Sequence, residues 1–185
     1  MLKDILIKTV EQRILSLFAA NPDQTFYGRE VSKRLKISLG ATSHTLRSLE
    51  RKNILISEKK GKICFYHLNL PNSSIEYFKV LNTILNVEPL IERLKNVSKC
   101  VILYGSYATG TFTSESDLDL FVVSEKREEV LEIIGNFKTK QAFDIRPVIK
   151  RQTEWMELER TDPEFFDEIN RGITLWEKPI DESSF

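Results

Sequence analysis

The most constraining feature of the sequence is residues 101–124, where a glycine, a serine and two aspartates stand between two apolar runs. The first run is short enough for a buried strand, and Gly105 and Ser106 end it. After ten further residues, Asp117 and Asp119 lead the second run. Side chains alternate along a strand, so we expect both aspartates on one face. Because carboxylates bind Mg²⁺ and turn N–H groups receive phosphates, this stretch indicates a site for a metal-bound phosphate.

The order of apolar strand, Gly-Ser, gap and Asp-x-Asp resembles the nucleotidyltransferase superfamily related to DNA polymerase beta, and most closely its small minimal members. The resemblance covers about residues 99–178. It includes a third carboxylate on a later strand, for which the candidate is Asp144 in a strand expected over residues 141–149. Many minimal members carry an arginine shortly after Gly-Ser, where this chain has Thr109.

The resemblance implies a Mg²⁺-dependent enzyme that moves a nucleoside monophosphate, such as AMP, from an NTP to an acceptor hydroxyl. Asp117 and Asp119 would hold two Mg²⁺ ions, and Asp144 would bind the ion nearer the acceptor and help to deprotonate its hydroxyl. Gly105 and Ser106 would bind the phosphates. Each carboxylate alone also has a structural interpretation, as a turn cap or as a buried group with a charged partner. Their occurrence in order favours the functional interpretation.

The charge of the chain is unevenly distributed, although 27 Lys/Arg and 27 Asp/Glu give a net charge of zero. Residues 1–70 carry 13 basic and 6 acidic side chains, and residues 71–185 carry 14 and 21. A basic part joined to an acidic part indicates two domains with different partners, of which the basic one suits nucleic acid. We expect a helical linker over residues 71–98 and the transferase domain over residues 99–185.

Apolar periodicity and turn residues predict three helices and a hairpin in the first 70 residues. They are helices over residues 5–20, 29–35 and 41–52, and strands over residues 54–58 and 63–68 with a basic tip over residues 59–62. Over about residues 8–70 this order resembles the winged helix-turn-helix domain of ArsR- or MarR-like regulators. The expected fold is therefore α+β with two domains: a winged helix, and an α/β nucleotidyltransferase domain with a small mixed sheet.

In winged-helix domains the third helix enters the major groove of double-stranded DNA, and the wing touches the DNA backbone or the minor groove. By this resemblance the candidates for DNA contact are Ser43, His44, Thr45, Arg47, Ser48 and Arg51 in the helix, and Lys59, Lys60 and Lys62 in the wing. Salt-sensitive DNA binding would follow. The alternative is a winged helix that binds another protein, with its basic side chains merely solvated.

The linker carries an apolar stripe at helical spacing through residue 97, and Pro89 is expected to break that helix in two. The stripe suits the seam of a homodimer and a contact with the neighbouring domain equally well. No apolar run approaches the ~20 residues of a membrane span, and the first residues lack a signal-peptide pattern. We therefore expect a cytoplasmic protein without membrane contact.

Two functions remain open on the sequence. The first is a nucleotidyltransferase with a DNA-binding module, whose acceptor is a protein such as a HEPN-type toxin, because some minimal family members are antitoxins that modify such toxins. The second is a transcriptional regulator whose transferase-like domain binds a nucleotide or a partner without catalysis. The three aspartates favour the first function, and Thr109 favours the second.

Overall fold

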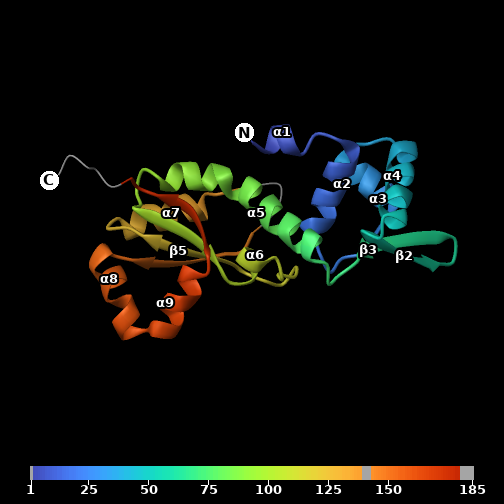
Figure 1. Cartoon of the computed structure of the whole chain (residues 1–185). Coiled ribbons are helices and arrows are strands. Elements are labelled where there is room, and N and C mark those ends of the chain that lie inside the picture. Colours follow the sequence, from blue (N-terminus) through green and yellow to red (C-terminus); the bar gives the residue numbers. More distant parts are fainter. Residues whose placement is uncertain (1, 139–142, 180–185) are drawn as a thin grey trace. The chain divides into compact units, whose positions relative to one another are not determined.

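A computed structural model of the chain describes residues 2–138 and 143–179, and it divides into two compact units (Figure 1). Unit 1 comprises Met1–Leu85 and Gly110–Glu115. Unit 2 comprises Asn86–Thr109 and Ser116–Phe185. The chain thus passes between the units three times, once within a long helix and once on each side of Gly110–Glu115.

Unit 1 begins with two helices, α1 (Lys3–Leu6) and α2 (Val10–Ala19), where the sequence pattern predicted one helix over residues 5–20. The prediction was wrong because Thr9 starts a new helix. Its hydroxyl accepts a hydrogen bond from the Gln12 N–H, and the Gln12 side chain accepts one from the Thr9 N–H. This capping box satisfies two backbone donors that an uninterrupted helix would have bonded internally.

The rest of unit 1 follows the predicted order of a winged helix. Its elements are β1 (Phe26–Tyr27), α3 (Gly28–Leu35), α4 (Leu39–Arg51), β2 (Leu55–Lys60) and β3 (Ile63–Leu68), followed by the first part of α5 (Ser73–Leu94). The strands form an antiparallel sheet in the order β1-β3-β2. The hairpin turn lies at Gly61, so Lys59 and Lys60 belong to β2 rather than to the predicted tip.

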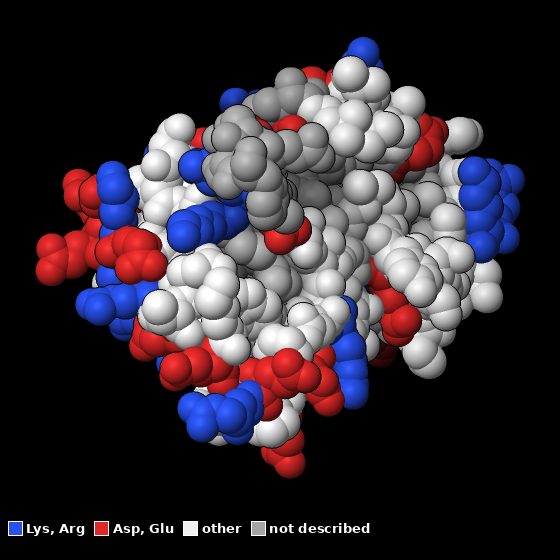
Figure 2. Space-filling model, turned by 60° about the vertical axis from the view of Figure 1, so that its left-hand side comes forward, with Lys and Arg blue, Asp and Glu red and all other residues white. Residues whose placement is uncertain are grey.

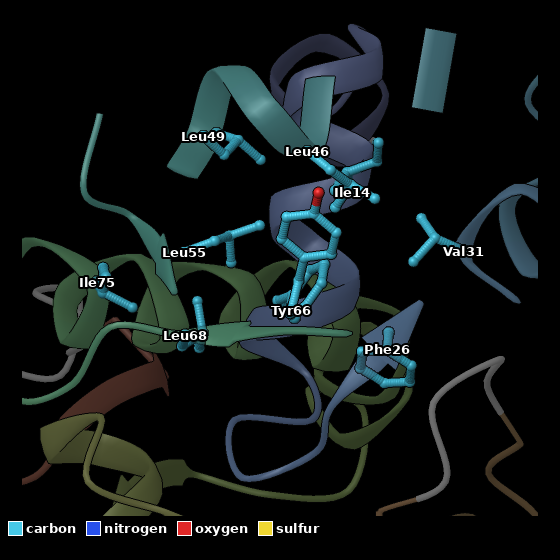
Figure 3. Close-up of a cluster of buried hydrophobic side chains, with 10 residues drawn as sticks. Ile14, Phe26, Val31, Leu46, Leu49, Leu55, Tyr66, Leu68 and Ile75 are labelled. Atoms are coloured by element: carbon cyan, nitrogen blue, oxygen red, sulfur yellow. The ribbon is translucent and has the colours of Figure 1, made fainter. Parts of the chain in front are cut away.

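One apolar core holds these elements together (Figure 3). Phe18 of α2 and Phe26 of β1 meet edge to face, with ring centroids 5.2 Å apart. Leu46 of α4 and Tyr66 of β3 are buried in the same cluster, and so is Ile75 of α5. The start of the predicted linker helix is therefore part of the winged-helix core, because its side chains complete that core.

Helix α5 differs from its prediction in two respects. It continues through Pro89 without a break. Its buried face also includes polar side chains, namely Lys79, Asn82, Thr83 and Asn86. Leu81, which the apolar stripe placed inside, is 39% exposed, and Tyr77 is 78% exposed. A homodimer seam along α5 stays a prediction.

Unit 2 is built on a four-stranded mixed sheet in the order β6-β5-β4-β7. Its elements are β4 (Cys100–Tyr104), α6 (Gly105–Thr109), β5 (Leu118–Val123), α7 (Arg127–Gly135), β6 (Ile145–Lys150), α8 (Gln152–Thr161), α9 (Pro163–Asn170) and β7 (Ile173–Glu177). Strands β5 and β6 are parallel, and the other pairs are antiparallel. The strand prediction for β6 started at residues 141–142, which lie outside the described residues.

Helices cover both faces of this sheet, with α7 on one side and α8 and α9 on the other (Figure 1). Leu158 and Ile169 pack with Ile102 and Phe121 on the face covered by α8 and α9. The outer surface of these two helices is acidic, as Figure 2 shows on its lower part. Among the described residues, no helix has the length and apolar character needed to cross a membrane.

Candidate active site and nucleic-acid interface

The candidate active site lies where β4 ends and where β5 and β6 begin. The antiparallel register pairs Tyr104 with Asp119, and the parallel register pairs Asp119 with Arg146. Paired residues on neighbouring strands share a face of the sheet. The end of β4, which leads into Gly105, therefore stands beside Asp119 in β5.

Gly105 is fitted to the carboxylate of Asp119. Its φ of +67° is in the left-handed region, which favours glycine. A Cβ atom at this position would lie 2.7 Å from Oδ2 of Asp119. The sequence argument expected glycine to give phosphates access to the backbone, whereas the structure shows that glycine also makes room for the aspartate. Ser106 follows in α6, a five-residue helix where a turn was expected, and its carbonyl accepts the Thr109 hydroxyl at 3.2 Å.

The two aspartates of Asp-x-Asp have different electrostatic surroundings. Asp117 forms an ion pair with Arg146, with Oδ2 and Nη1 2.8 Å apart. Burial raises the pKa of Asp119 above its ordinary value, the charges of Asp117 and Glu168 raise it further, and Arg146 opposes them. The site therefore holds more negative than positive charge. A divalent cation offsets such an excess, and carboxylates are its preferred ligands, so the aspartates present fit Mg²⁺.

Glu168 of α9 is a residue that the sequence analysis missed. Burial raises the pKa of Tyr104 to about 12, and the charges of Asp119 and then Glu168 contribute to the rise. The rings of Tyr104 and Phe165 meet at 5.7 Å, which places α9 against the end of β4. A signal was available, because Glu168 lies one helical turn after Phe165 and directly before the buried Ile169. It belongs to the negative charge around Asp119.

Asp144 lies beside the start of β5 and directly precedes β6, whereas the sequence analysis expected it within that strand. Its carbonyl accepts a hydrogen bond from the Leu118 N–H at 2.7 Å, directly before the parallel pairing of β5 and β6. Its side chain is exposed. Among the described residues, however, no three His, Cys, Asp or Glu side chains are grouped closely enough to hold a metal ion together. The three-aspartate metal site therefore stays a prediction.

The candidate DNA interface in unit 1 lies on the outer side of α4. An open hollow of about 600 Å³ is lined by Gly40, Ser43, His44, Arg47, Glu50 and Arg51. Ser48 is half-buried, and Lys59, Lys60 and Lys62 of the wing are exposed. Thr45 is 2% exposed, because it faces the core beside Leu46, so it is removed from the candidates.

Comparison with known proteins identifies the class of unit 2. Residues 87–172 match the family model described as a nucleotidyltransferase domain. These residues therefore form a nucleotidyltransferase domain, and the predicted resemblance to such a domain is confirmed. A curated relative, "Putative protein adenylyltransferase MJ0141" of Methanocaldococcus jannaschii, is 28% identical over 89 residues, which are 44% of this chain and 83% of the relative.

Three solved structures of regulators resemble the chain more distantly. Reduced HlyU from Vibrio cholerae has 26% identity and a TM-score of 0.34, covering 40% of this chain and 75% of its own. A "possible transcriptional regulator" from Methanosarcina mazei has 19% identity and a TM-score of 0.35, and the match covers 51% of this chain and 83% of the regulator. Adhesin competence repressor from Streptococcus pyogenes has 22% identity and a TM-score of 0.39, and the match covers 52% of this chain and 74% of the repressor. The winged-helix assignment rests instead on the element order and strand register of unit 1.

Proposed function

We propose that the chain is a Mg²⁺-dependent enzyme that transfers AMP from ATP to a hydroxyl group of a protein, and that unit 1 binds double-stranded DNA. The observation that carries the enzymatic part is the fit of the Asp119 carboxylate against Gly105, beside Asp117. The choice of AMP and of a protein acceptor rests on the description of the curated relative as a protein adenylyltransferase.

Asp117 and Asp119 would hold Mg²⁺, and Asp144, directly before β6, is the further ligand that the resemblance implies. Bound Mg²⁺ supplies charge that stabilises the attacking and leaving oxygens of the phosphoryl group. The chain's own contribution is to orient the ligands. The sheet and Gly105 fix Asp119, while Arg146 holds Asp117 through one exposed ion pair and is 69% exposed itself. If Asp117 bound the metal instead, Arg146 would be free to contact the triphosphate.

The acceptor side of the proposal is a protein hydroxyl. A HEPN-type toxin is the acceptor that the family resemblance suggests, which would make the chain an antitoxin. The second candidate function is a regulator whose transferase domain binds nucleotide without catalysis. One observation favours that candidate: Asp117 is engaged by Arg146 in an ion pair.

The DNA-binding part of the proposal is supported by the exposed basic residues of α4 and the wing. Arg47 and Arg51 lie on the outer side of α4, and Lys59 and Lys62 lie on the hairpin. Lys60 lies on the hairpin too. It forms an ion pair with Glu58, with Nζ and Oε2 3.2 Å apart, and its side chain remains exposed. Such residues would contact phosphates, so binding would weaken as salt rises.

The first experiment measures ATP binding by calorimetry with and without Mg²⁺. Wild type should bind ATP in a Mg²⁺-dependent way, and the double variant Asp117→Asn/Asp119→Asn should not. The matched control is Glu128→Gln/Glu132→Gln, which removes the same charge from two exposed positions on α7. Labelled ATP and candidate acceptor proteins then test transfer. If folded wild type binds none of the four NTPs, the enzymatic proposal is wrong and the regulator is favoured.

The DNA proposal has its own experiment. Replacing Lys59, Lys60 and Lys62 together by Gln should weaken binding to duplex DNA in fluorescence anisotropy. The slope of log affinity against log salt should also fall, by about one unit for each lost phosphate contact. The control replaces three basic residues of unit 2 by Gln, namely Lys126, Arg160 and Lys178. Equal DNA affinity of the two triple variants would contradict the proposed interface.

A further inference from the structure

Unit 2 contains a cavity at an edge of its sheet that the proposed reaction does not use. The cavity has a volume of about 260 Å³, and its lining comes from residues within 124–127 and 149–154. The first stretch leads from β5 into α7, and the second leads from β6 into α8. Because β5 and β6 are parallel, both stretches leave the sheet at the carboxyl ends of these strands. Ligands of open α/β sheets commonly bind at that edge.

The cavity is separate from the candidate active site of the same unit. Asp119 is the second residue of β5, whereas Ser124 directly follows the last residue of that strand. A strand rises by roughly 3.3 Å per residue, so these two positions lie about 16 Å apart. A ligand in the cavity would therefore be additional to the metal and the nucleotide of the proposed reaction.

Three basic side chains line the cavity, namely those of Arg127, Lys150 and Arg151. The guanidinium group of Arg127 is held in place, because its Nη1 donates to the Ile149 carbonyl at 3.1 Å. An arginine has five N–H donors, so this bond leaves others for a ligand. The ion pairs among the described residues of unit 2 join other side chains, and none includes these three. The cavity thus has three positive groups without a paired carboxylate.

Two glutamates also line the cavity, but each of them binds the start of α8. Oε1 of Glu125 accepts a hydrogen bond from the Gln152 N–H at 3.2 Å, and Oε2 of Glu154 accepts one from the Arg151 N–H at 2.7 Å. These carboxylates occupy backbone donors that an anion at a helix N-terminus would use. Recognition of an anion in this cavity would therefore come from the basic side chains and not from the helix.

Ser124 fixes the two stretches to each other. It is only 2% exposed, and its N–H donates to the Lys150 carbonyl at 2.9 Å. Its hydroxyl donates to the Val97 carbonyl at 2.5 Å and accepts a hydrogen bond from the Lys126 N–H at 2.9 Å. The backbone beside Arg127 and the backbone of Lys150 are thus joined before any ligand binds. Such preorganisation lowers the entropy that binding must overcome.

We propose that this cavity binds the phosphate group of a small phosphorylated ligand, with Arg127, Lys150 and Arg151 as its contacts. Arginine matches phosphate oxygens in bidentate geometry, and the two charges of a phosphate suit several cations better than the single charge of a carboxylate. The volume is near the lower end of the roughly 300–1,000 Å³ of small-molecule sites, which leaves room for an attached group such as a nucleoside. The proposal does not depend on the transfer reaction.

The experiment uses AMP and inorganic phosphate as probes, without a divalent metal. The protein is the full-length Asp117→Asn/Asp119→Asn variant, which lacks the two proposed metal ligands of the active site. Calorimetry measures the affinity of each probe. Arg127→Gln and Lys150→Gln, each added to this variant, should weaken AMP binding about tenfold, because each removes a charged hydrogen bond. The matched controls are Lys126→Gln and Arg160→Gln, which remove exposed basic residues of the same unit that do not line the cavity.

A further variant should change the affinity in the opposite direction. Glu125→Gln keeps a carbonyl oxygen for the Gln152 N–H but removes a negative charge from the lining, so AMP should bind a few-fold more tightly. Amide hydrogen exchange then locates the ligand. AMP should slow exchange in peptides over residues 121–130 and 147–155, and it should leave residues 105–120 unchanged.

The outcomes separate the source of the phosphate from the existence of the site. Tighter binding of AMP than of inorganic phosphate would identify a nucleotide as the ligand, and equal affinities would show that the phosphate group alone is recognised. If the folded variant binds neither probe at millimolar concentration, the inference is wrong. It is also wrong if AMP protects residues 105–120 instead, or if Lys150→Gln binds AMP as tightly as the controls. Should Arg127→Gln fail to fold, Lys150→Gln and Glu125→Gln decide, because neither change removes the bond between Arg127 and Ile149.

Discussion

Asp117 and Asp119 are held in opposite ways, although one residue separates them. Asp119 lies within β5, and its carboxylate fits against Gly105 so closely that a methyl group there would collide with it. Asp117 precedes the strand and is held through an ion pair with the exposed Arg146. One carboxylate is thus fixed by the sheet, and the other has a partner that it can exchange. The sheet thus sets the geometry of Asp119, and the ion pair offsets the charge of Asp117.

The two aspartates also depend on different parts of the chain. Asp119 is held by strand pairing within unit 2, since it is paired in register with Tyr104 and Arg146. Asp117 is joined through Ser116 to the segment Gly110–Glu115, which unit 1 holds. The following variants test this contrast.

The largest effect is expected for Gly105→Ala, which attacks the fixed carboxylate. The φ of +67° alone is expected to cost about 1–3 kcal/mol of unfolding free energy in a residue with a Cβ. The new methyl group must also displace the Asp119 carboxylate, so AMP transfer should fall more than about a hundredfold. Urea unfolding and labelled-ATP transfer measure the two losses.

The control for this variant is Gly135→Ala at the end of α7, where nothing lies within 4 Å of the new Cβ. It should be neutral or stabilising by up to about 1 kcal/mol, and activity should not change. A Gly105→Ala protein that keeps wild-type transfer would show that the close fit to Asp119 has no role in the reaction.

Asp119→Asn tests the surroundings of Asp119 through the pH dependence of the melting temperature. Since the folded-state pKa of Asp119 is raised above 3.8, its ionised form costs the wild type stability at neutral pH, and this cost is absent below pH 3.8. The variant should therefore melt higher than wild type at pH 7 and lose that advantage as the pH falls through the raised pKa. Thermal melts from pH 7 to pH 3 measure the difference.

Mg²⁺ provides the second arm of the same experiment. It should raise the melting temperature of wild type and not that of Asp119→Asn, because the metal stabilises only the protein that binds it. Glu132→Gln, on α7, changes the net charge by the same amount away from the site. If Glu132→Gln shows the same pH profile as Asp119→Asn, net charge and not the local site explains the gain.

The sequence was sufficient to predict those elements around the two aspartates, and in the winged helix, that depend on local residue patterns. The apolar runs that lead into Gly105 and out of Asp119 became strands β4 and β5, and the helix–helix–hairpin order of residues 29–68 was correct. Period-two alternation predicted the two aspartates on a common face, but only Asp119 lies within β5, so that part stays a prediction. The fold class could therefore be predicted from short stretches.

The sequence was insufficient where a residue's role depends on a distant part of the chain. Lys79 is a buried donor because its ammonium group bonds the carbonyl of Phe112, which is 33 positions away. Asp23 bonds Ser114, which is 91 positions away. Helical periodicity contains no information on such pairings. The same limit explains why Glu168 was missed, since its importance comes from the packing of α9 on β4.

The smallest effect is expected for Arg146→Met, which removes the exchangeable partner of Asp117. The side chain is 69% exposed, so stability should change by less than about 1 kcal/mol. Without nucleotide, Mg²⁺ should bind a few-fold more tightly, because Asp117 no longer has to leave an ion pair. With ATP the KM should rise, because the triphosphate loses a positive partner.

Calorimetry measures the Mg²⁺ affinity and steady-state kinetics measures the KM, and Arg160→Met on α8 is the control. If Mg²⁺ affinity and KM both stay at wild-type values, the ion pair does not regulate the charge of the site, and the contrast between the two aspartates is one of geometry alone.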